Sequence, residues 1–178
     1  MLNIFQIESR EDRKSVRELF WEYLQWANDE VNDNFGVSFD IKTMLQEDMN
    51  TLDKFLPPYG RLLLAEQDGR VAGLGCLKKL KDDIGEIKRM YVRSDYRRKG
   101  IGKALLENLL EEAGEIGYTR VWLDSARFMK SAHALYRSYG FQEIEPYPES
   151  EIPAEFQSNW IFMEKKLSNI CRDIFILE

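Results

Sequence analysis

The residues best suited to chemistry lie between Glu86 and Gly117, in the stretch EIKRMYVRSDYRRKGIGKALLENLLEEAGEIG. An apolar run ends at Val92, the basic segment RRKGIGK follows at 97–103, and an amphipathic helix pattern comes next. The first turn of a helix presents unbonded N–H groups and the positive end of its dipole, and both attract anions. Glycine lets a phosphate approach the backbone without a Cβ in between. The segment therefore predicts a site for a phosphate-bearing ligand.

Two common phosphate-binding loops do not fit this segment. A Walker A loop needs the pattern GxxxxGK[ST], which the chain lacks. A dinucleotide-binding fingerprint needs a third small residue at the position where this chain has Leu105. What remains is Arg-x-x-Gly-x-Gly, formed by Arg97, Gly100 and Gly102 between a strand and a helix.

Composition and charge limit the kinds of ligand that the protein is expected to bind. The 178 residues are enough for one well-buried domain, and 44% are hydrophobic and 31% charged, as in ordinary globular proteins. Residues 1–50 hold 11 acidic and 5 basic side chains, which equals the whole net charge of −6, whereas residues 86–103 hold 7 basic and 2 acidic ones. A local basic cradle on an acidic protein favours a small phosphate-bearing ligand over nucleic acid. The acidic N-terminal third fits either a cationic substrate or a solvated surface.

The sequence lacks the features of membrane, secreted and zinc-binding proteins. No apolar run approaches the roughly 18–20 residues that span a bilayer, and the N-terminus has no signal-peptide pattern. Cys76 and Cys171 show no metal or disulfide spacing, and with one histidine a zinc site is not expected. We therefore expect no metal, no membrane partner and a cytoplasmic location.

The elements that must position the basic segment follow from hydrophobic periodicity. Strands are predicted at 3–7, 61–66, 71–79, 87–92, 119–125, 141–144 and 160–165. Helices are predicted from an N-cap at Ser9 to Ala27, at 41–55, from the glycine segment to Ile116, and at 131–139, with loops at 29–40 and 146–153. This order predicts a mixed α/β fold with one central sheet and helices on both faces. We expect residues 1–178 to form a single domain with a core at about 3–166. The apolar tail 167–178 is expected to dock on the body or on a second subunit, as in a homodimer.

A second motif supports a family resemblance. The segment ALYRSYGF at 134–141 resembles the helix that ends in A-L-Y-x-x-x-G-F in the GNAT superfamily of N-acetyltransferases, and Arg97, Gly100 and Gly102 resemble that superfamily's pyrophosphate loop, Gln/Arg-x-x-Gly-x-Gly/Ala. The two motifs come in the family's order, and the resemblance covers residues 60–166 well. It implies a GNAT-like mixed sheet of about seven strands.

The resemblance also implies a site. The pyrophosphate of acetyl-CoA is expected on the basic loop, the pantetheine arm along the strand before it, and one N–H of that strand on the thioester carbonyl. The implied cofactor-binding residues are Met90, Tyr91, Val92, Arg97, Arg98, Lys99, Gly100, Ile101, Gly102 and Lys103. Tyr136 matches the family's acid for the departing thiolate, and Glu86 resembles the glutamate base of the histone-type members. Asp124 is a second candidate base.

Four kinds of residue lie outside the two motifs or depart from the family's pattern. Many family members carry an asparagine seven residues before the tyrosine, and here Met129 stands in that position. His133 is read as a surface or rim residue. Cys76 has no evident His or Asn partner, so a covalent acyl-enzyme is not expected. Trp21 and Trp26 fall off the apolar face of the first helix and either line a pocket or pack beneath a loop.

The sequence thus predicts an acetyl-CoA-dependent N-acetyltransferase that transfers acetyl directly to a primary amine in a ternary complex. The acceptor stays open between a small metabolite, an amino acid and a protein amine, because the fold does not determine it. One alternative is a non-catalytic acyl-CoA-binding sensor, which would not depend on Tyr136 or Glu86. Another is a transferase for a different acyl group or a hydroxyl acceptor.

Overall fold

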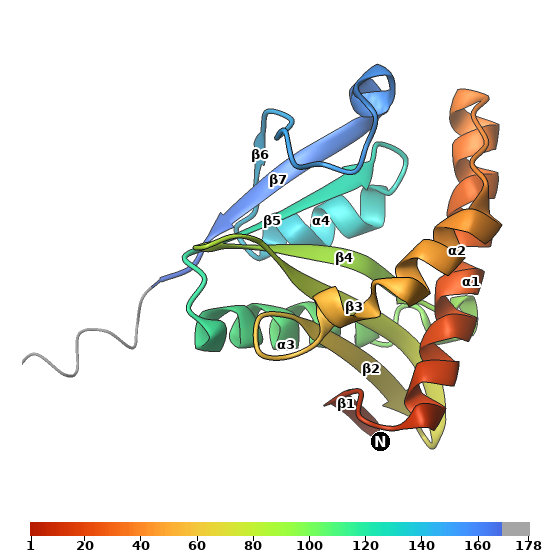
Figure 1. The fold of residues 1–178 in the computed structure, drawn as a ribbon, viewed down its shortest axis with the longest axis vertical. Helices are drawn as coiled ribbons and strands as arrows, with labels where there is room; N and C mark the ends of the chain where they lie inside the picture. The colour runs from red at the N-terminus through yellow and green to blue at the C-terminus, as the bar shows by residue number, and fades with distance from the viewer. Residues whose placement is uncertain (169–178) are drawn as a thin grey trace, which may run out of the picture.

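A single mixed sheet forms the centre of the computed structural model, which describes residues 1–168 (Figure 1). Its strand order is β1-β2-β3-β4-β5-β7-β6. The strands are β1 (Leu2–Gln6), β2 (Arg61–Gln67), β3 (Arg70–Lys81), β4 (Ile84–Val92), β5 (Arg120–Ala126), β6 (Gln142–Ile144) and β7 (Trp160–Lys166). The helices are α1 (Arg10–Phe35), α2 (Ile41–Asn50), α3 (Ile101–Ile116) and α4 (Lys130–Ser138), with short 3-10 helices η1 (Leu52–Phe55), η2 (Ser94–Tyr96) and η3 (Ala154–Asn159).

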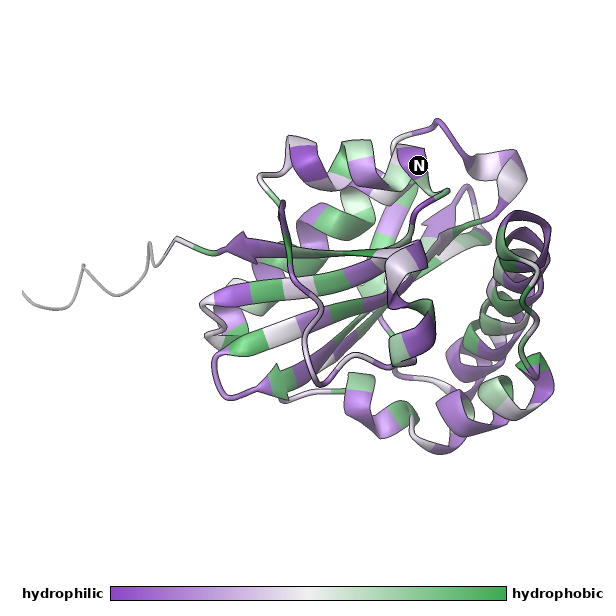
Figure 2. Ribbon diagram, turned by 90° about the horizontal axis from the view of Figure 1, so that it is seen from above, coloured by the Kyte–Doolittle hydropathy of each residue, from purple (hydrophilic) through white to green (hydrophobic). Residues whose placement is uncertain are grey.

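Helices cover both faces of the sheet because its strands are apolar on both sides (Figure 2). Successive residues of a strand point to opposite faces. In β2, Leu62 and Leu64 pack with α1 and α2, whereas Leu63 and Ala65 pack with α3 and α4. The expected mixed α/β sheet with helices on both faces is confirmed.

The sheet splits in the middle, and this split creates the site. β4 and β5 run parallel and are paired only where Ile84–Glu86 face Arg120–Trp122. Beyond Glu86 and Trp122 the two strands separate, while β3 continues to pair with β4 and β7 with β5. One edge of β4 is therefore free of sheet partners from Ile87 onward.

A β-bulge changes the direction of the side chains of β4 next to the split. Its pairing with β3 shifts register between Leu74 and Cys76, and Arg89 takes a positive φ of 54°. A left-handed conformation in a residue other than glycine costs about 1–2 kcal/mol and is commonly kept at functional sites. The extra residue interrupts the strict alternation of side chains in this strand.

The boundaries differ from the sequence predictions in one important place. The segment 29–40 was predicted as a loop, but α1 continues to Phe35 and ends at Gly36, which has a φ of 68°. Val31 and Phe35 extend the apolar side of the helix by one further turn, and Gly36 is the first residue suited to a left-handed cap. The predicted docking of the tail concerns residues that lie largely outside the described part of the chain. No helix within residues 1–168 is long and apolar enough to cross a membrane.

Candidate active site

The glycine segment forms an open row of N–H donors between β4 and α3. Arg98 and Gly100 both have positive φ values, 61° and 80°, and α3 starts at Ile101. Within residues 1–168, no protein acceptor meets the N–H groups of Arg98 to Gly100, and those of the first helical turn have no intrahelical acceptor. A Cβ on Gly102 would lie 3.9 Å from Val92 and 4.0 Å from Leu135, so internal packing does not require glycine there. The cradle therefore fits a phosphate group that approaches from outside.

Arg97 connects this loop to the end of β4. Its Nε donates a hydrogen bond of 3.0 Å to the carbonyl oxygen of Val92. Its guanidinium also lies 5.1 Å from the ring centre of Trp26 and 5.9 Å from that of Tyr91, which are distances for cation–π contact. Arg97 thus fixes the loop against β4 and α1, and Trp26 borders the site.

A cavity of about 90 Å³ occupies the split between β4 and β5. Its walls come from α1 on one face of the sheet, α4 on the other, and the two separated strands. The lining residues are Tyr23, Ala27, Val31, Ile87, Lys88, Arg89, Met90, Leu123, Asp124, Ser125, Ala126, Met129, Tyr136 and Trp160. Four consecutive residues of β4 contribute, which the bulge at Arg89 makes feasible.

Tyr136 and Met90 meet in this cavity. The Tyr136 hydroxyl lies 4.0 Å from the Met90 sulfur, so the predicted acid stands beside the predicted cofactor strand. Burial raises the pKa of Tyr136, which keeps its hydroxyl protonated at neutral pH. The arrangement provides a buried O–H donor at the free edge of β4.

The two candidate bases occupy different positions. Glu86 is fully buried and is not among the residues that line the cavity. Its carboxylate lies 3.2 Å from Lys78 Nζ and 3.5 Å from Lys88 Nζ. Asp124 does line the cavity and pairs with Lys88 at 2.9 Å. The two carboxylates therefore share Lys88, and Asp124 is the one that reaches the open space.

Tyr147 forms a hydrogen bond with Glu86, and the sequence analysis did not identify this tyrosine as a site residue. Its hydroxyl donates a hydrogen bond of 2.7 Å to Glu86 Oε1. Burial and the nearby Glu86 carboxylate raise the pKa of Tyr147. Tyr147 belongs to the irregular segment between β6 and β7, where no periodic pattern indicates which strand a side chain will meet.

The interpretation of His133 was wrong. His133 is only 3% exposed, and its Nε2 lies 3.0 Å from Ser125 Oγ. Burial lowers the pKa of His133, so the ring stays neutral at neutral pH. His133 precedes Tyr136 by three residues and shares the buried face of α4. Ser125 also donates to the Met129 sulfur at 3.4 Å, and Met129 lines the cavity in place of the family's asparagine.

Cys76 faces the opposite side of the sheet. It packs in the core beneath α1 and α2 and is fully buried. Burial raises the pKa of the Cys76 thiol, which disfavours the thiolate form that a nucleophile needs.

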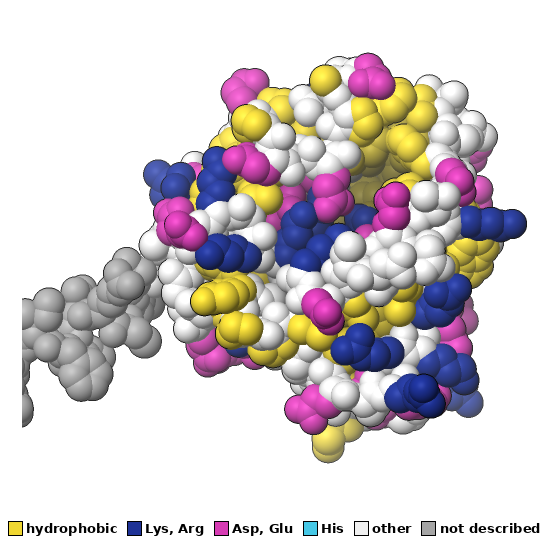
Figure 3. All heavy atoms as spheres, in the orientation of Figure 1, with side chains coloured by type: hydrophobic (Ala, Val, Ile, Leu, Met, Phe, Trp, Pro, Cys, Tyr) yellow, Lys and Arg dark blue, Asp and Glu magenta, His cyan; other side chains and the backbone are white. Residues whose placement is uncertain are grey.

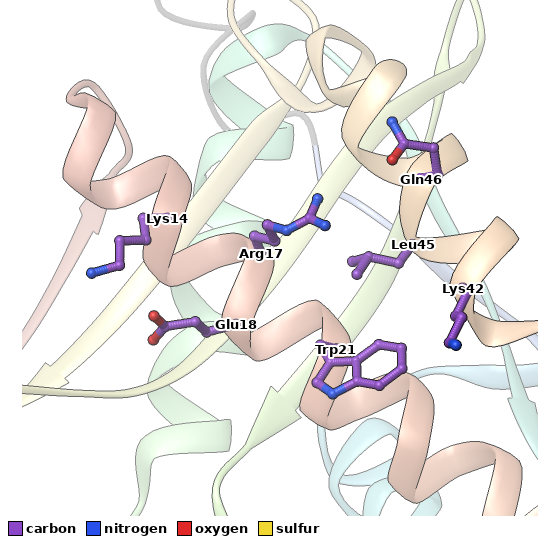
Figure 4. A pocket seen from close by; sticks show the side chains of 7 residues that line it. All are labelled: Lys14, Arg17, Glu18, Trp21, Lys42, Leu45 and Gln46. Carbon is purple, nitrogen blue, oxygen red and sulfur yellow. The ribbon is translucent and has the colours of Figure 1, made fainter.

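A second groove, of about 650 Å³, lies between α1 and α2 (Figure 4). Arg17 and Trp21 of α1 face Lys42, Leu45 and Gln46 of α2 across it. Of the two alternatives given for Trp21, the structure shows the first, because Trp21 lines this groove. None of the predicted catalytic or cofactor-binding residues does, so the groove is separate from the cavity at Tyr136.

Comparison with known proteins agrees with this site. The chain belongs to the acetyltransferase (GNAT) family, whose model matches residues 13–141. It is 28% identical to an uncharacterized N-acetyltransferase of Schizosaccharomyces pombe, over 94% of this chain and 96% of that protein. It is 37% identical to the uncharacterized N-acetyltransferase YsnE of Bacillus subtilis, over 65% of this chain and 76% of that protein. These similarities identify the protein as an acyltransferase enzyme.

A solved structure supports the fold. The PaiA N-acetyltransferase of Thermoplasma acidophilum, solved in complex with coenzyme A, superposes with a TM-score of 0.71 at 20% identity. The match covers 94% of this chain and 99% of that one.

Proposed function

We propose that this protein is an acetyl-CoA-dependent N-acetyltransferase that transfers acetyl directly to a primary amine in a ternary complex. The observation that carries the proposal is the continuity of three features. The row of N–H donors at Arg98 to Lys103 adjoins the free edge of β4, and that edge leads to the buried hydroxyl of Tyr136. The PaiA structure, which contains coenzyme A, provides an independent reason to expect this ligand.

The chain offers a separate contact for each part of acetyl-CoA. The N–H groups of Arg98 to Lys103 hold the pyrophosphate, with the helix dipole of α3 adding positive potential. The backbone of Met90, Tyr91 and Val92 binds the pantetheine arm along the free strand edge. The bound thioester supplies the activated acetyl group.

The cavity residues then serve the transfer. The amine nitrogen forms a bond to the acetyl carbon as the bond from that carbon to sulfur breaks. Tyr136 donates its hydroxyl hydrogen toward the departing sulfur, and a contribution of this kind is typically worth 10²–10⁴-fold in rate. Asp124 receives the amine proton, directly or through water. Glu86 has an indirect role, because its ion pair with Lys88 holds that lysine beside Asp124.

Nearby positive charge assists deprotonation of the amine. Lys88 and Arg89 line the same cavity, and like charges lower the pKa of an ammonium group, which is about 10 in water. The burial of Cys76 on the far side of the core supports direct transfer over an acyl-enzyme.

Calorimetry with CoA and acetyl-CoA, followed by thiol-release assays on an amine panel, tests the proposal. We expect binding of both ligands and thiol release that depends on the amine. Binding without turnover on any amine would instead favour a non-catalytic acyl-CoA sensor. Turnover with alcohols alone would favour a hydroxyl acceptor, and absence of CoA binding would overturn both the enzyme and the sensor.

A further inference from the structure

Three cationic side chains meet beside the cavity, at the end away from the glycine loop. Lys78 of β3 and Lys88 and Arg89 of β4 have side chains that are only 13%, 5% and 13% exposed. Figure 3 shows Lys and Arg side chains in a hollow on the face seen in Figure 1, with acidic side chains around it. Buried charges of one sign are costly unless carboxylates neutralise them.

Carboxylates on the rigid elements neutralise only part of this charge. Asp124 pairs with Lys88, and Glu86 lies 3.2 Å from Lys78 and 3.5 Å from Lys88. Asp48 of α2 forms two hydrogen bonds of 2.8 and 3.1 Å with Arg89. Asp48 also lies 3.8 Å from a further cation, Lys54. When Lys54, whose side chain is 31% exposed, is counted with Lys78, Lys88 and Arg89, four cations share three such carboxylates, so this group without Glu151 carries one net positive charge.

Glu151 supplies the missing negative charge from an irregular segment. It lies between β6 and η3, and its side chain is 40% exposed. Its carboxylate lies 2.9 Å from Lys78, 3.6 Å from Lys88 and 3.9 Å from Arg89. Although burial opposes ionisation, Lys88 and Lys78 lower the pKa of Glu151 to about 2, so the carboxylate is charged at neutral pH.

We infer that Lys78, Lys88 and Arg89 form a subsite for a carboxylate of the amine acceptor, and that Glu151 fills this subsite while no acceptor is bound. The inference rests on the proposed function, since it names the class of amine: one that also carries a carboxylate. Lys88 and Arg89 line the cavity that holds Tyr136, so a carboxylate bound there belongs to the molecule whose amine reacts.

Lys78 keeps a carboxylate partner when Glu151 moves away. Glu86 Oε2 is buried and accepts no hydrogen bond among the described residues, yet it lies 3.2 Å from Lys78 Nζ. When Glu151 leaves, Lys78 can reorient toward this oxygen. The position of Glu151 on a loop, against partners on strands, makes it the group that moves.

Matched acceptors test the inference. We would measure KM for α-amino acids and a graded series of ω-amino acids, each beside its primary amide, which lacks the carboxylate charge. We expect KM about tenfold or more lower for the best carboxylate than for its amide, because charge-assisted hydrogen bonds are lost in the amide. Equal or better use of the amides throughout would overturn the inference.

Two variants separate the subsite from general effects. Glu151→Gln removes the competing charge, so the preference for carboxylate over amide should increase several-fold. Lys78→Gln should reduce the same preference, whereas Lys79→Gln should not, because Lys79 pairs with Asp82 at the exposed end of β3. If Glu151→Gln instead raises KM for carboxylate acceptors, Glu151 assists binding and the inference is wrong.

A binding measurement keeps the inference distinguishable from the proposed function. If no amine is acetylated, the proposed function fails, and titration with N-acetylglycine and N-acetylglycinamide still probes the subsite. We expect the acid to bind Glu151→Gln more tightly than the wild type, and the amide to show no such gain. Turnover without any dependence on the carboxylate would reject the subsite alone.

Discussion

The hydroxyl of Tyr136 on α4 lies 4.0 Å from the sulfur of Met90 on β4, in the cavity at the split between β4 and β5. The two residues are 46 positions apart in the chain, and they meet because β4 and β5 separate after Glu86. A thioester held along β4 would therefore have its sulfur within reach of a buried, protonated hydroxyl.

Replacement of this tyrosine is the first test. Tyr136→Phe should lower kcat by about a hundredfold or more, because a proton donor to the leaving group is worth 10²–10⁴-fold. Calorimetric affinity for CoA should change little. Tyr139→Phe is the control, because the exposed Tyr139 hydroxyl bonds Glu107 on the surface. An unchanged kcat in Tyr136→Phe would remove Tyr136 from the chemistry.

Replacement of a glycine in the loop before α3 should weaken cofactor binding. Gly102→Val should weaken CoA binding more than tenfold, because the added side chain occupies the space that a phosphate needs. Its melting temperature should fall only slightly, since a Cβ there has ordinary neighbours. Gly114→Val, on the same helix and also unobstructed, should retain CoA affinity. Similar affinity in both variants would contradict the cradle.

The two carboxylates should behave differently when each is neutralised. Asp124→Asn should lower kcat at least tenfold, with the loss greatest at low pH where the amine is most protonated. Glu86→Gln should chiefly lower the free energy of unfolding, because it leaves Lys78 and Lys88 with less compensation. Steady-state rates across pH and urea unfolding measure the two effects. A larger kcat loss in Glu86→Gln than in Asp124→Asn would make Glu86 the direct base.

The hydrogen bond from Tyr147 should be important for stability. Tyr147→Phe deprives a fully buried carboxylate of a donor, which costs about 1–3 kcal/mol in the free energy of unfolding. Urea unfolding at neutral pH measures this loss. In the background of Glu86→Gln the same replacement should cost less, since no buried charge is then left without its donor. Equal costs in both backgrounds would show that Tyr147 does not act on Glu86.

Glu151 should make folding stability depend on acid pH. Its folded pKa of about 2 lies below the ordinary 4.5, so the unfolded chain takes up the proton first as pH falls. The stabilisation by Glu151 is therefore present above pH 4.5 and lost progressively toward pH 2. Wild type and Glu151→Gln should thus differ in free energy of unfolding near neutral pH and converge in acid. The control is Glu155→Gln in the neighbouring helix η3. Glu155 has no ion pair within residues 1–168, so this variant should track the wild type. A constant gap across this range would contradict the ion-pair geometry.

Local patterns carried much of the prediction. The glycine segment and the ALYRSYGF helix are short motifs whose conformation depends on nearby residues. The sequence therefore predicted the loop before α3 and the position of Tyr136 on α4. The order of strands and helices along the chain likewise predicted one central sheet with helices on both faces.

Contacts between distant segments were beyond such patterns. Lys78 meets Glu151 across 73 positions and Tyr147 meets Glu86 across 61. Tyr147 and Glu151 belong to a proline-rich segment without periodicity, whose path depends on tertiary packing. The burial of His133 was the exception, because its spacing from Tyr136 already placed it on the buried face of α4.

The most direct test of acetyl transfer to an amine follows both products of one reaction. Purified protein, acetyl-CoA and each amine of the panel would be incubated while free CoA thiol is titrated and the amine product is analysed by mass spectrometry. We expect equal amounts of free CoA and N-acetylated amine, with no thiol released when the amine is omitted. Tight acetyl-CoA binding without product from any amine, or thiol release that does not require the amine, would contradict it.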